Sequence, residues 1–244
     1  MKKQKQLGQH FLNSSKIADL ITSEAAISKS DIVYEVGTGR GILTPLLCKN
    51  AKRVVSIDSD RQLYEAALSN FAGIENLTLQ CGDGFKQNYD FTIFVSNLPY
   101  SESRRAIEWL AQTTFSHGVI MVQKEFAGKL LSDISSERKA VSVIAKHAFE
   151  MTLISNVGCK NFDPPPRVDS VLLKIRKKRT MEKTLIQTIN KMFSYRKKKI
   201  KNILGQFGVE TDMDKRLDDL SSEGIVSIAK QVREYVIKRA QEHI

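Results

Sequence analysis

The sequence predicts an α/β protein in which a mostly parallel sheet is covered by helices and is followed by a small helical domain. Over residues 1–177, short apolar runs alternate with helical patterns, as expected for a parallel sheet with helices on both faces. After Lys178 the extended runs stop, and apolar residues recur at the spacing of helices. We therefore predict two domains, 1–177 and 178–244.

The predicted elements follow one another in regular order along the first domain. Short apolar runs predict strands at residues 31–36, 53–57, 77–80, 91–95, 118–122, 147–157 and 169–175. Helices are predicted at residues 17–26, 42–49, 61–71 and 102–111 and from Lys124 onward. In the second domain, one apolar helix face is expected from Leu185, Ile189, Met192 and Phe193, and another from Ile225, Ile228, Ala229, Val232 and Val236.

Positive charge is concentrated in one part of the chain. The formal net charge is +11, and residues 174–201 contain twelve Lys or Arg and one Glu. The rest of the chain is therefore close to neutral. A strongly basic segment on a neutral body indicates a polyanionic partner, most commonly nucleic acid. The alternative is a solvated basic face without a specific partner.

Composition favours a cytoplasmic protein. No apolar run approaches the ~20 residues that span a bilayer, and no apolar segment typical of a secretory signal follows the basic residues 1–5. The three cysteines are too few and too scattered for a disulfide framework, so we expect them to pack in a reducing cytosol. The histidines show no metal-ligand spacing, and no coiled-coil pattern is present. We therefore expect a monomer without a metal.

A glycine-rich loop follows the first predicted strand. It contains Glu35, Gly37, Gly39 and Gly41, and glycines at this point let the backbone approach a ligand closely. Asp58 ends the second strand, where a carboxylate can bind both hydroxyls of a ribose. Asp83 follows the third strand and can accept a hydrogen bond from an adenine amino group.

Two ligands compete for this loop. A nicotinamide dinucleotide would place its pyrophosphate on the following helix, but it normally uses a Gly-x-Gly-x-x-Gly pattern. The spacing here is Gly-x-Gly-x-Gly, and the Glu35 carboxylate suits a cationic ligand better than a pyrophosphate. These residues favour S-adenosylmethionine, which carries a sulfonium and an ammonium group.

The tetrapeptide Asn97-Leu98-Pro99-Tyr100 lies between a predicted strand and a helix. Asn97 supplies an acceptor oxygen, Pro99 restricts the backbone, and Tyr100 supplies a face for stacking. This combination can hold a flat, polar ring that carries nitrogen atoms. The alternative is a turn that ends the strand, since Asn and Pro are common in turns.

Several motifs in order along nearly the whole chain resemble those of the ribosomal RNA adenine N6-dimethyltransferases, most closely the small-subunit type. They are Leu7–Leu12, the glycine loop, Asn97–Tyr100, Gln123–Glu125 with Ala127, the segment Phe162–Ser170 with its Phe-x-Pro-x-Pro-x-Val-x-Ser pattern, and the basic stretch Phe193–Lys199 leading to Asn202–Leu204. The chain departs from the family pattern at residues 101–103, which are Ser-Glu-Ser, and at Asp58, where Glu is frequent.

The resemblance implies a Rossmann-like class I methyltransferase sheet with one antiparallel strand at its edge. It implies S-adenosylmethionine as the methyl donor, with S-adenosylhomocysteine as product, and small-subunit ribosomal RNA or the immature subunit as partner. The implied activity is N6,N6-dimethylation of two adjacent adenosines near the 3′ end of that RNA, with a role in subunit biogenesis.

The expected site residues fall into three groups. Cofactor contacts are expected from His10, Leu12, Glu35, Gly37, Gly39, Asp58, Asp83 and Asn97. The target base is expected to meet Asn97, Leu98, Pro99, Tyr100 and Phe162. RNA is expected to meet Arg196, Lys197, Lys198, Lys199 and Lys201.

Two other functions remain open from the sequence. A large-subunit adenine methyltransferase of the macrolide-resistance type shares the fold and the Asn-x-Pro-aromatic motif. The second alternative is a ribosome-assembly factor in which binding matters more than catalysis. A DNA adenine methyltransferase is less consistent with the motif, because that class usually begins it with Asp.

Overall fold

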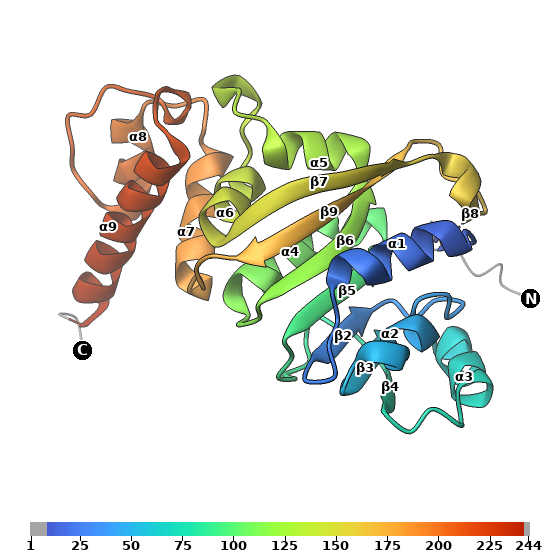
Figure 1. Ribbon diagram of the computed structural model, residues 1–244. Helices are drawn as coiled ribbons and strands as arrows, with labels where there is room; N and C mark the ends of the chain where they lie inside the picture. Colours follow the sequence, from blue (N-terminus) through green and yellow to red (C-terminus); the bar gives the residue numbers. More distant parts are fainter. Residues whose placement is uncertain (1–8, 242–244) are drawn as a thin grey trace, which may run out of the picture. The chain divides into compact units, whose positions relative to one another are not determined.

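The computed structural model describes residues 9–241, and Figure 1 shows it as a ribbon. Within these residues, seven strands form one sheet in the order β4-β3-β2-β5-β6-β9-β7. They are β2 (Ile32–Val36), β3 (Arg53–Asp58), β4 (Leu77–Cys81), β5 (Ile93–Asn97), β6 (His117–Gln123), β7 (Phe149–Val157) and β9 (Ser170–Lys177). The pairs from β4 to β6 are parallel, and β9 runs antiparallel to β6. The predicted α/β class is confirmed.

The position of the reversed strand corrects the sequence prediction. β9 does not lie at the edge but between β6 and β7, so β7 is the edge strand. Burial explains the order: residues 170–173 of β9 are all buried, as expected for an inner strand. Between its buried end residues, β7 instead has only exposed and partly buried residues, and Leu153 is 48% exposed. An edge strand leaves such side chains in solvent.

Helices connect the strands largely where they were predicted. They are α1 (Ser15–Ala25), α2 (Thr44–Asn50), α3 (Arg61–Asn70), α4 (Ser103–Gln112) and α5 (Lys124–Leu131). In Figure 1, α1 crosses in front of the sheet, where its buried residues join a core with β2, β5, β6 and β9. The N-terminus of α3 is capped by Asp60, whose side chain accepts hydrogen bonds from the backbone of Gln62 and Leu63.

One helix was missed. Residues 147 and 148 were predicted to begin a strand, but they end α6 (Ala140–Ala148), and β7 begins at Phe149. Almost every residue of α6 is buried. Apart from Ser142, its polar residues Lys146 and His147 lie in the last turn, so no polar face runs along the helix to reveal its period.

The chain divides into two compact units. The first comprises residues 1–106, 114–127 and 151–177, and the second comprises residues 107–113, 128–150 and 178–244. One division falls between residues 177 and 178, and the second unit also includes two earlier segments. The reason is packing: α6 contacts both α7 (Lys183–Ser194) and α9 (Ser222–Gln241), which bury their apolar faces together.

The second unit also contains the short helix α8 (Ile200–Leu204). The predicted apolar face of α9 is buried from Ile225 to Val232, whereas Val236 is 43% exposed. Among the described residues, no helix is both long and apolar enough to cross a membrane.

Two short strands form a separate antiparallel pair. β1 (Phe11–Leu12) pairs with β8 (Phe162–Asp163), so that Phe11 faces Asp163 and Leu12 faces Phe162. The side chains of Leu12 and Phe162 both join the core beneath α1. This pair brings the N-terminal motif, of which residues 7 and 8 lie outside the described part, beside the Phe162–Ser170 segment.

Candidate active site

A cavity of about 700 Å³ opens at the carboxyl ends of the parallel strands in the first unit. This edge is where open α/β sheets bind ligands. The predicted residues that line it are His10, Gly37, Gly39, Asp58, Asp83, Asn97, Leu98, Pro99, Tyr100 and Phe162. Leu12 and Glu35 are not part of the lining. The structure therefore brings most of the predicted cofactor and base residues into one cavity.

The glycine loop forms one wall of this cavity. Gly37 and Gly41 have φ angles of 88° and 80°, which L side chains rarely adopt. The Gly37 amide donates to the Ile57 carbonyl at 2.7 Å, so the loop is tied to the end of β3. A side chain at Gly41 would collide with the ring of Phe71, since a Cβ atom would lie 2.3 Å from it. The backbone conformation therefore favours glycine at both positions, and packing against Phe71 adds a second requirement at Gly41.

Asp58 is held by the backbone around it. Its Oδ2 accepts a hydrogen bond from the Gly39 amide at 2.8 Å, and its Oδ1 accepts one from the Asp60 amide at 2.8 Å. The residue is only 5% exposed, and burial raises the pKa of its carboxyl group although these hydrogen bonds oppose the shift. Each oxygen retains a lone pair, so the side chain can accept further hydrogen bonds from a ligand in the cavity.

Glu35 lies behind the loop rather than in the lining. Its Oε2 accepts hydrogen bonds from Thr44 at 2.7 Å and Ser56 at 2.6 Å, and the residue is completely buried. Burial raises the pKa of the carboxyl group to about 7. Oε1 has no hydrogen-bond partner among the described residues. A buried acceptor without a partner is costly unless a ligand supplies the donor.

Asp83 is held differently, by a side chain that sequence patterns did not single out. Its Oδ1 accepts from the Phe85 amide at 3.0 Å, and its Oδ2 accepts from Arg105 at 2.5 Å. Burial alone would raise the pKa of Asp83, but the Arg105 and Phe85 hydrogen bonds and the charges of Arg105 and Lys86 lower it. Arg105 and Glu102 also line the cavity. In the sequence, residues 101–103, which are Ser-Glu-Ser, depart from the family motif, but this departure did not point to Arg105.

Asn97 is oriented toward the cavity by its own amide nitrogen. Nδ2 donates to the His10 carbonyl at 3.3 Å, and this hydrogen bond identifies which end of the side-chain amide is the nitrogen. The side-chain oxygen is therefore left to accept hydrogen bonds. The Pro99 carbonyl is engaged by the Glu102 amide at 2.9 Å, so the Leu98 carbonyl is the better candidate for a second acceptor. The Leu98 side chain itself is buried in the core.

Tyr100 is fixed at both its ring and its hydroxyl group. The hydroxyl forms a 2.7 Å hydrogen bond with Ser170, which is fully buried at the start of β9. The ring lies 5.7 Å from that of His10, whose Nδ1 is 2.8 Å from the Pro164 carbonyl. Phe162 contributes to the cavity wall but is only 3% exposed. The residues expected to hold the base are thus anchored by three separate segments.

A second unpredicted arginine lies at the glycine loop. The guanidinium of Arg40 is 2.6 Å from Asp163 and lies over the ring of Phe11, 4.6 Å from its centroid. These contacts connect the loop to the β1–β8 pair. They were not predictable, because nothing in the sequence indicates that residues 11, 40 and 163 meet.

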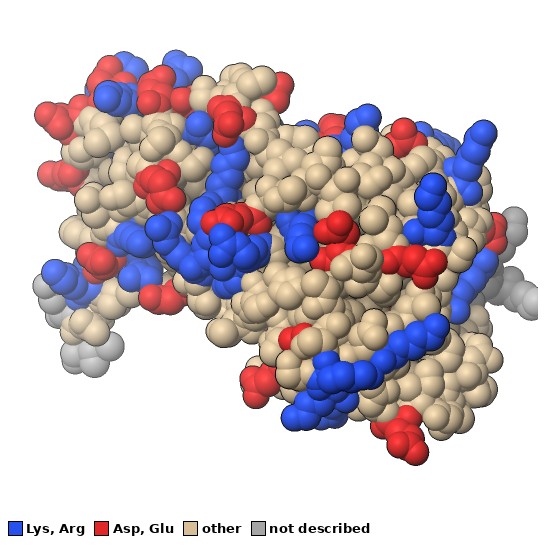
Figure 2. Space-filling model, in the orientation of Figure 1, with Lys and Arg blue, Asp and Glu red and all other residues tan. Residues whose placement is uncertain are grey.

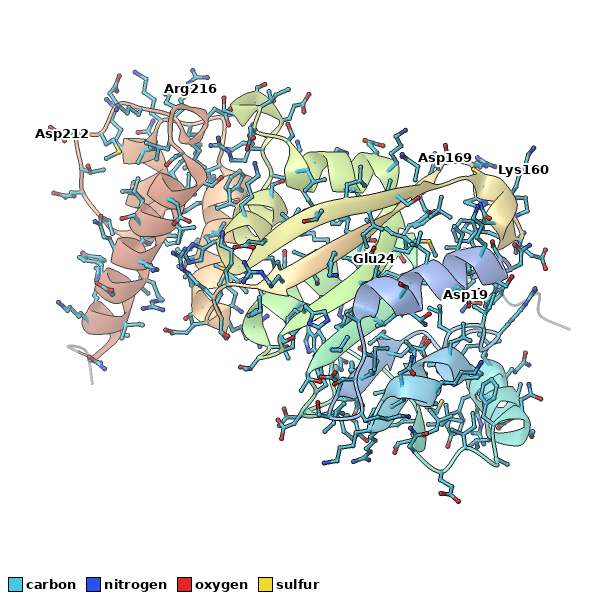
Figure 3. All side chains as sticks on the ribbon, viewed as in Figure 1. Asp19, Glu24, Lys160, Asp169, Asp212 and Arg216 are labelled. Atoms are coloured by element: carbon cyan, nitrogen blue, oxygen red, sulfur yellow. The ribbon has the colours of Figure 1, made fainter. Side chains whose placement is uncertain are left out.

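The basic residues expected to bind RNA lie outside the cavity, in the second unit. Three of the five are paired with carboxylates: Arg196 lies 2.9 Å from Asp218, and Lys199 and Lys201 lie 2.5 and 2.7 Å from Asp214. Asp214 belongs to the segment between α8 and α9 in which Figure 3 labels Asp212 and Arg216. Figure 2 likewise shows acidic side chains interspersed among the basic ones.

The remaining basic residues of the 174–201 stretch do not form one uniform surface. Lys174, on β9, pairs at 3.4 Å with Glu24, which Figure 3 labels on α1. Lys198 lies over the ring of Tyr195, 5.0 Å from its centroid. Lys197 is exposed and forms no ion pair with any residue in the described range 9–241. Net charge therefore overstates how much free positive charge the segment presents.

The arrangement of motifs has a direct counterpart among known proteins. A sequence model of the family described as ribosomal RNA adenine dimethylase matches residues 1–235. The chain belongs to this family. This match confirms the predicted family and the enzyme class of an rRNA adenine dimethyltransferase, and methyltransferases in general use S-adenosylmethionine.

Individual relatives of this dimethylase cover nearly all of it. The chain is 32% identical over 235 residues to the ribosomal RNA small subunit methyltransferase A of Thermotoga neapolitana, covering 92% of this chain and 89% of that protein. It is 30% identical over 247 residues to the probable ribosomal RNA small subunit methyltransferase A of Methanosarcina mazei, with 92% and 91% covered. A crystal structure of a dimethyladenosine transferase from Plasmodium falciparum matches with a TM-score of 0.79 and 26% identity, covering 92% of this chain and 98% of that one.

Proposed function

We propose that this dimethylase transfers methyl groups from S-adenosylmethionine to N6 of two adjacent adenosines near the 3′ end of small-subunit ribosomal RNA. The observation that carries the proposal is the orientation of Asn97. Its amide nitrogen is engaged by the His10 carbonyl, and its oxygen is left to accept in the cavity that Gly39 and Asp58 also line. The proposed base acceptor and the proposed ribose-binding carboxylate therefore line one cavity.

The names of the relatives favour the small subunit over the large subunit as the source of the RNA. Both sequence relatives described above are named small subunit methyltransferases, and they cover about nine-tenths of the chain. The role in subunit biogenesis belongs to the same proposal.

The residues of the cavity fit S-adenosylmethionine. Asp58 would accept hydrogen bonds from the ribose hydroxyls, and Asp83 would accept one from the adenine amino group. Glu35 is completely buried and is not part of the lining, so its carboxyl group would favour the ligand's cationic groups from behind the loop, and only where it is ionised. When bound, S-adenosylmethionine supplies an electrophilic methyl group on a sulfonium centre.

The protein's part in the chemistry is to position the target nitrogen. N6 of adenine is a weak nucleophile, because its lone pair is delocalised into the ring. If Asn97 Oδ1 and the Leu98 carbonyl accept the two N6 hydrogens, the nitrogen is drawn toward tetrahedral geometry and its lone pair becomes available. In this position the nitrogen would be held to accept the methyl group that bound S-adenosylmethionine supplies, and the proton that N6 loses would pass to solvent. Positioning of this kind supplies up to about 7–11 kcal/mol of a barrier.

The target base must leave its stack to enter the cavity. Tyr100, anchored by Ser170, would stack on the extruded base, and such stacking is worth about 1–3 kcal/mol. The basic residues Arg196–Lys199 and Lys201 would contact RNA phosphates elsewhere on the molecule. The most direct contribution is expected from Lys197 and Lys198, because the other three residues already pair with carboxylates.

The proposal is tested by methylation of purified ribosomal subunits that lack the modification. Small and large subunits are incubated separately with the protein and labelled S-adenosylmethionine, and the products are mapped at single-nucleotide resolution. We expect two adjacent dimethyladenosines in the small-subunit RNA. Label confined to the large subunit, or no label with either, would contradict the proposal.

Asn97→Ala is the variant that tests the site itself. We expect it to lose about 100-fold or more in methyl transfer, similar to the loss of one transition-state hydrogen bond in other enzymes. Binding of S-adenosylhomocysteine, measured by calorimetry, should fall much less, because the variant removes a contact to the base. Near-normal turnover in this variant would exclude the proposed role of Asn97.

A further inference from the structure

An ion pair in the cavity joins Asp83, the expected acceptor of the adenine amino group, to Arg105, which has no part in the proposed chemistry. Arg105 is the third residue of α4, and Asp83 follows β4. Nη2 of Arg105 lies 2.5 Å from Oδ2 of Asp83, and both residues line the cavity. Both lie within the first unit. The side chain of Asp83 is 31% exposed and that of Arg105 is 45% exposed.

The guanidinium group of Arg105 is fixed by more than this one contact. Its Nη1 donates to Glu102 at 3.2 Å, and its carbon lies over the ring of Phe85, 5.1 Å from the centroid. An arginine fork that binds two carboxylates and stacks on an aromatic ring has little freedom to rotate. The Lys86 ammonium is farther from Asp83, at 4.0 Å, and its side chain is 75% exposed. Arg105 is therefore the side chain that determines where the Asp83 carboxylate points.

The backbone around Asp83 is already held in place. The Tyr34 hydroxyl donates to the Gly84 carbonyl at 2.7 Å, and a Cβ atom at Gly84 would lie 2.7 Å from Val36. The Phe85 amide restrains Oδ1 of Asp83 at 3.0 Å. With the backbone fixed, the remaining freedom is rotation of the carboxylate, and Arg105 restrains its second oxygen. Each oxygen still has a lone pair for a ligand's amino group.

We propose that Arg105 is a positioning residue that directs the Asp83 carboxylate and thereby sets the preference of the cavity for a cofactor base with an exocyclic amino group. The inference rests on the proposed binding of S-adenosylmethionine. A fixed carboxylate accepts a hydrogen bond from the adenine amino group and repels the carbonyl oxygen that hypoxanthine carries at the same position. A carboxylate that rotates freely can turn away from that oxygen, so it discriminates less.

A second use of Arg105, direct binding of an RNA phosphate, is less consistent with its contacts. Both terminal nitrogens already donate to carboxylates, Asp83 and Glu102. Because these contacts use two of its five N–H groups, a phosphate would have to bind the remaining groups beside two carboxylates that repel it. The experiment below separates the two uses.

The test is calorimetric binding of S-adenosylhomocysteine and of its inosine analogue, S-inosylhomocysteine, to the full chain. The wild-type protein should prefer the adenine compound by about 100-fold or more, as expected for a site built to accept a hydrogen bond. In Arg105→Ala this ratio should fall at least about 10-fold, mainly through weaker binding of the adenine compound. Arg105→Lys, which keeps the charge but not the fork, should give an intermediate ratio.

Arg61→Ala is the matched control. Arg61 also pairs with a carboxylate, Glu65 at 2.9 Å, but it lies on α3 outside the cavity lining. This variant removes the same charge from the first unit and should leave the ratio unchanged. Thermal unfolding of each variant establishes that it is folded before the binding measurements are compared.

The outcomes are distinct. Equal weakening of both compounds in Arg105→Ala, with the ratio preserved, would overturn the inference in favour of a general structural role. Unchanged binding of both, together with weaker binding of RNA, would overturn it in favour of a phosphate contact. If the wild-type protein binds neither compound, the proposed cofactor itself is wrong, and the inference falls with it.

Discussion

Charged side chains are fixed by backbone groups in the cavity but by exposed ion pairs in the second, helical unit (the helical unit below). In the cavity, Asp58 is 5% exposed and is fixed by two backbone amides. In the helical unit, Lys199 and Lys201 share Asp214, and the side chains of all three are about half exposed. The first arrangement is set by the fold. The second is an exposed ion pair of the kind that contributes little to stability and is screened by salt.

This difference indicates where substitutions will matter. A carboxylate fixed by backbone amides cannot move without moving the loop, so its removal should abolish a specific contact. A lysine in an exposed ion pair can leave its partner for a phosphate at low cost. The cavity should therefore respond to single substitutions, and the helical unit should respond mainly to salt and to combined substitutions.

The largest effect is expected from Asp58→Ala. Hydrogen bonds to a charged group are worth about 1.5–3 kcal/mol each, so losing two ribose contacts should weaken S-adenosylhomocysteine binding by roughly 1,000-fold. The neighbouring Asp60→Ala is the control, because the Asp60 side chain caps α3 and does not line the cavity, while its backbone amide, which holds Asp58, is kept. It should lower the free energy of unfolding by about 1 kcal/mol and leave affinity nearly unchanged. Calorimetry and denaturant unfolding measure the two effects, and equal affinities for both variants would contradict this role of Asp58.

The second effect concerns the dependence of stability on pH. Folding raises the pKa of Glu35 from 4.5 to about 7, so between these values the folded state binds the extra proton. The free energy of unfolding of the ligand-free protein should therefore decrease as pH rises from about 4.5 to 7, relative to Glu35→Gln. The change should reach at most about 3 kcal/mol, since one pKa unit is worth about 1.4 kcal/mol. A difference that does not vary with pH would show that Glu35 keeps its ordinary pKa.

The third effect separates the ring of Tyr100 from its hydroxyl group. Tyr100→Ala should reduce methyl transfer by roughly 10- to 30-fold, since base stacking is worth about 1–3 kcal/mol. Tyr100→Phe removes only the hydrogen bond with Ser170 and should cost about 1 kcal/mol, or roughly 5-fold. Turnover of unmodified small subunits measures both. Equal losses would mean that the hydroxyl group, rather than the ring, carries the function.

The smallest effect sharpens the comparison within the helical unit. Replacing both Lys197 and Lys198 by Ala should make the slope of log affinity for RNA against log salt concentration shallower. The change should correspond to the loss of about one to two phosphate contacts. Replacing both Lys199 and Lys201 should change the slope less, because these residues pair with Asp214 in the free protein. RNA binding measured from low to moderate salt gives both slopes. If the second double variant has the larger effect, the ion pairs with Asp214 do not persist when RNA binds.

Position along the strands was the most informative part of the sequence. Asp58, Asp83 and Asn97 each follow or end a predicted strand and were all expected to contact the cofactor, and the structure places all three in one cavity. They meet there because the carboxyl ends of parallel strands lie at the same edge of a sheet. Strands were predicted in the right places even where their ends differ, as at β5, which begins at Ile93 rather than Phe91.

Contacts between distant segments could not be predicted in the same way. Arg105 reaches Asp83 across 22 residues, and Arg40 reaches Asp163 across 123 residues, and neither spacing has a sequence signature. The pairing of Lys199 with Asp214 was missed for the same reason: counting charges does not show which carboxylates fold beside them. Helix α6 was not predicted because it has no polar face along its length to make its periodicity visible.

The β1–β8 pair has a consequence for the order in which the protein acquires its site during synthesis. The cavity wall formed by His10 and Phe11 is held by residues 162–164, and the Tyr100 hydroxyl is held by Ser170. A growing chain that has emerged only as far as β6 contains every predicted cofactor carboxylate, yet it lacks the partner of β1 and the anchor of Tyr100. If the cavity holds methyl donor and base as proposed, it is therefore complete only after the ribosome has synthesised the segment through Ser170.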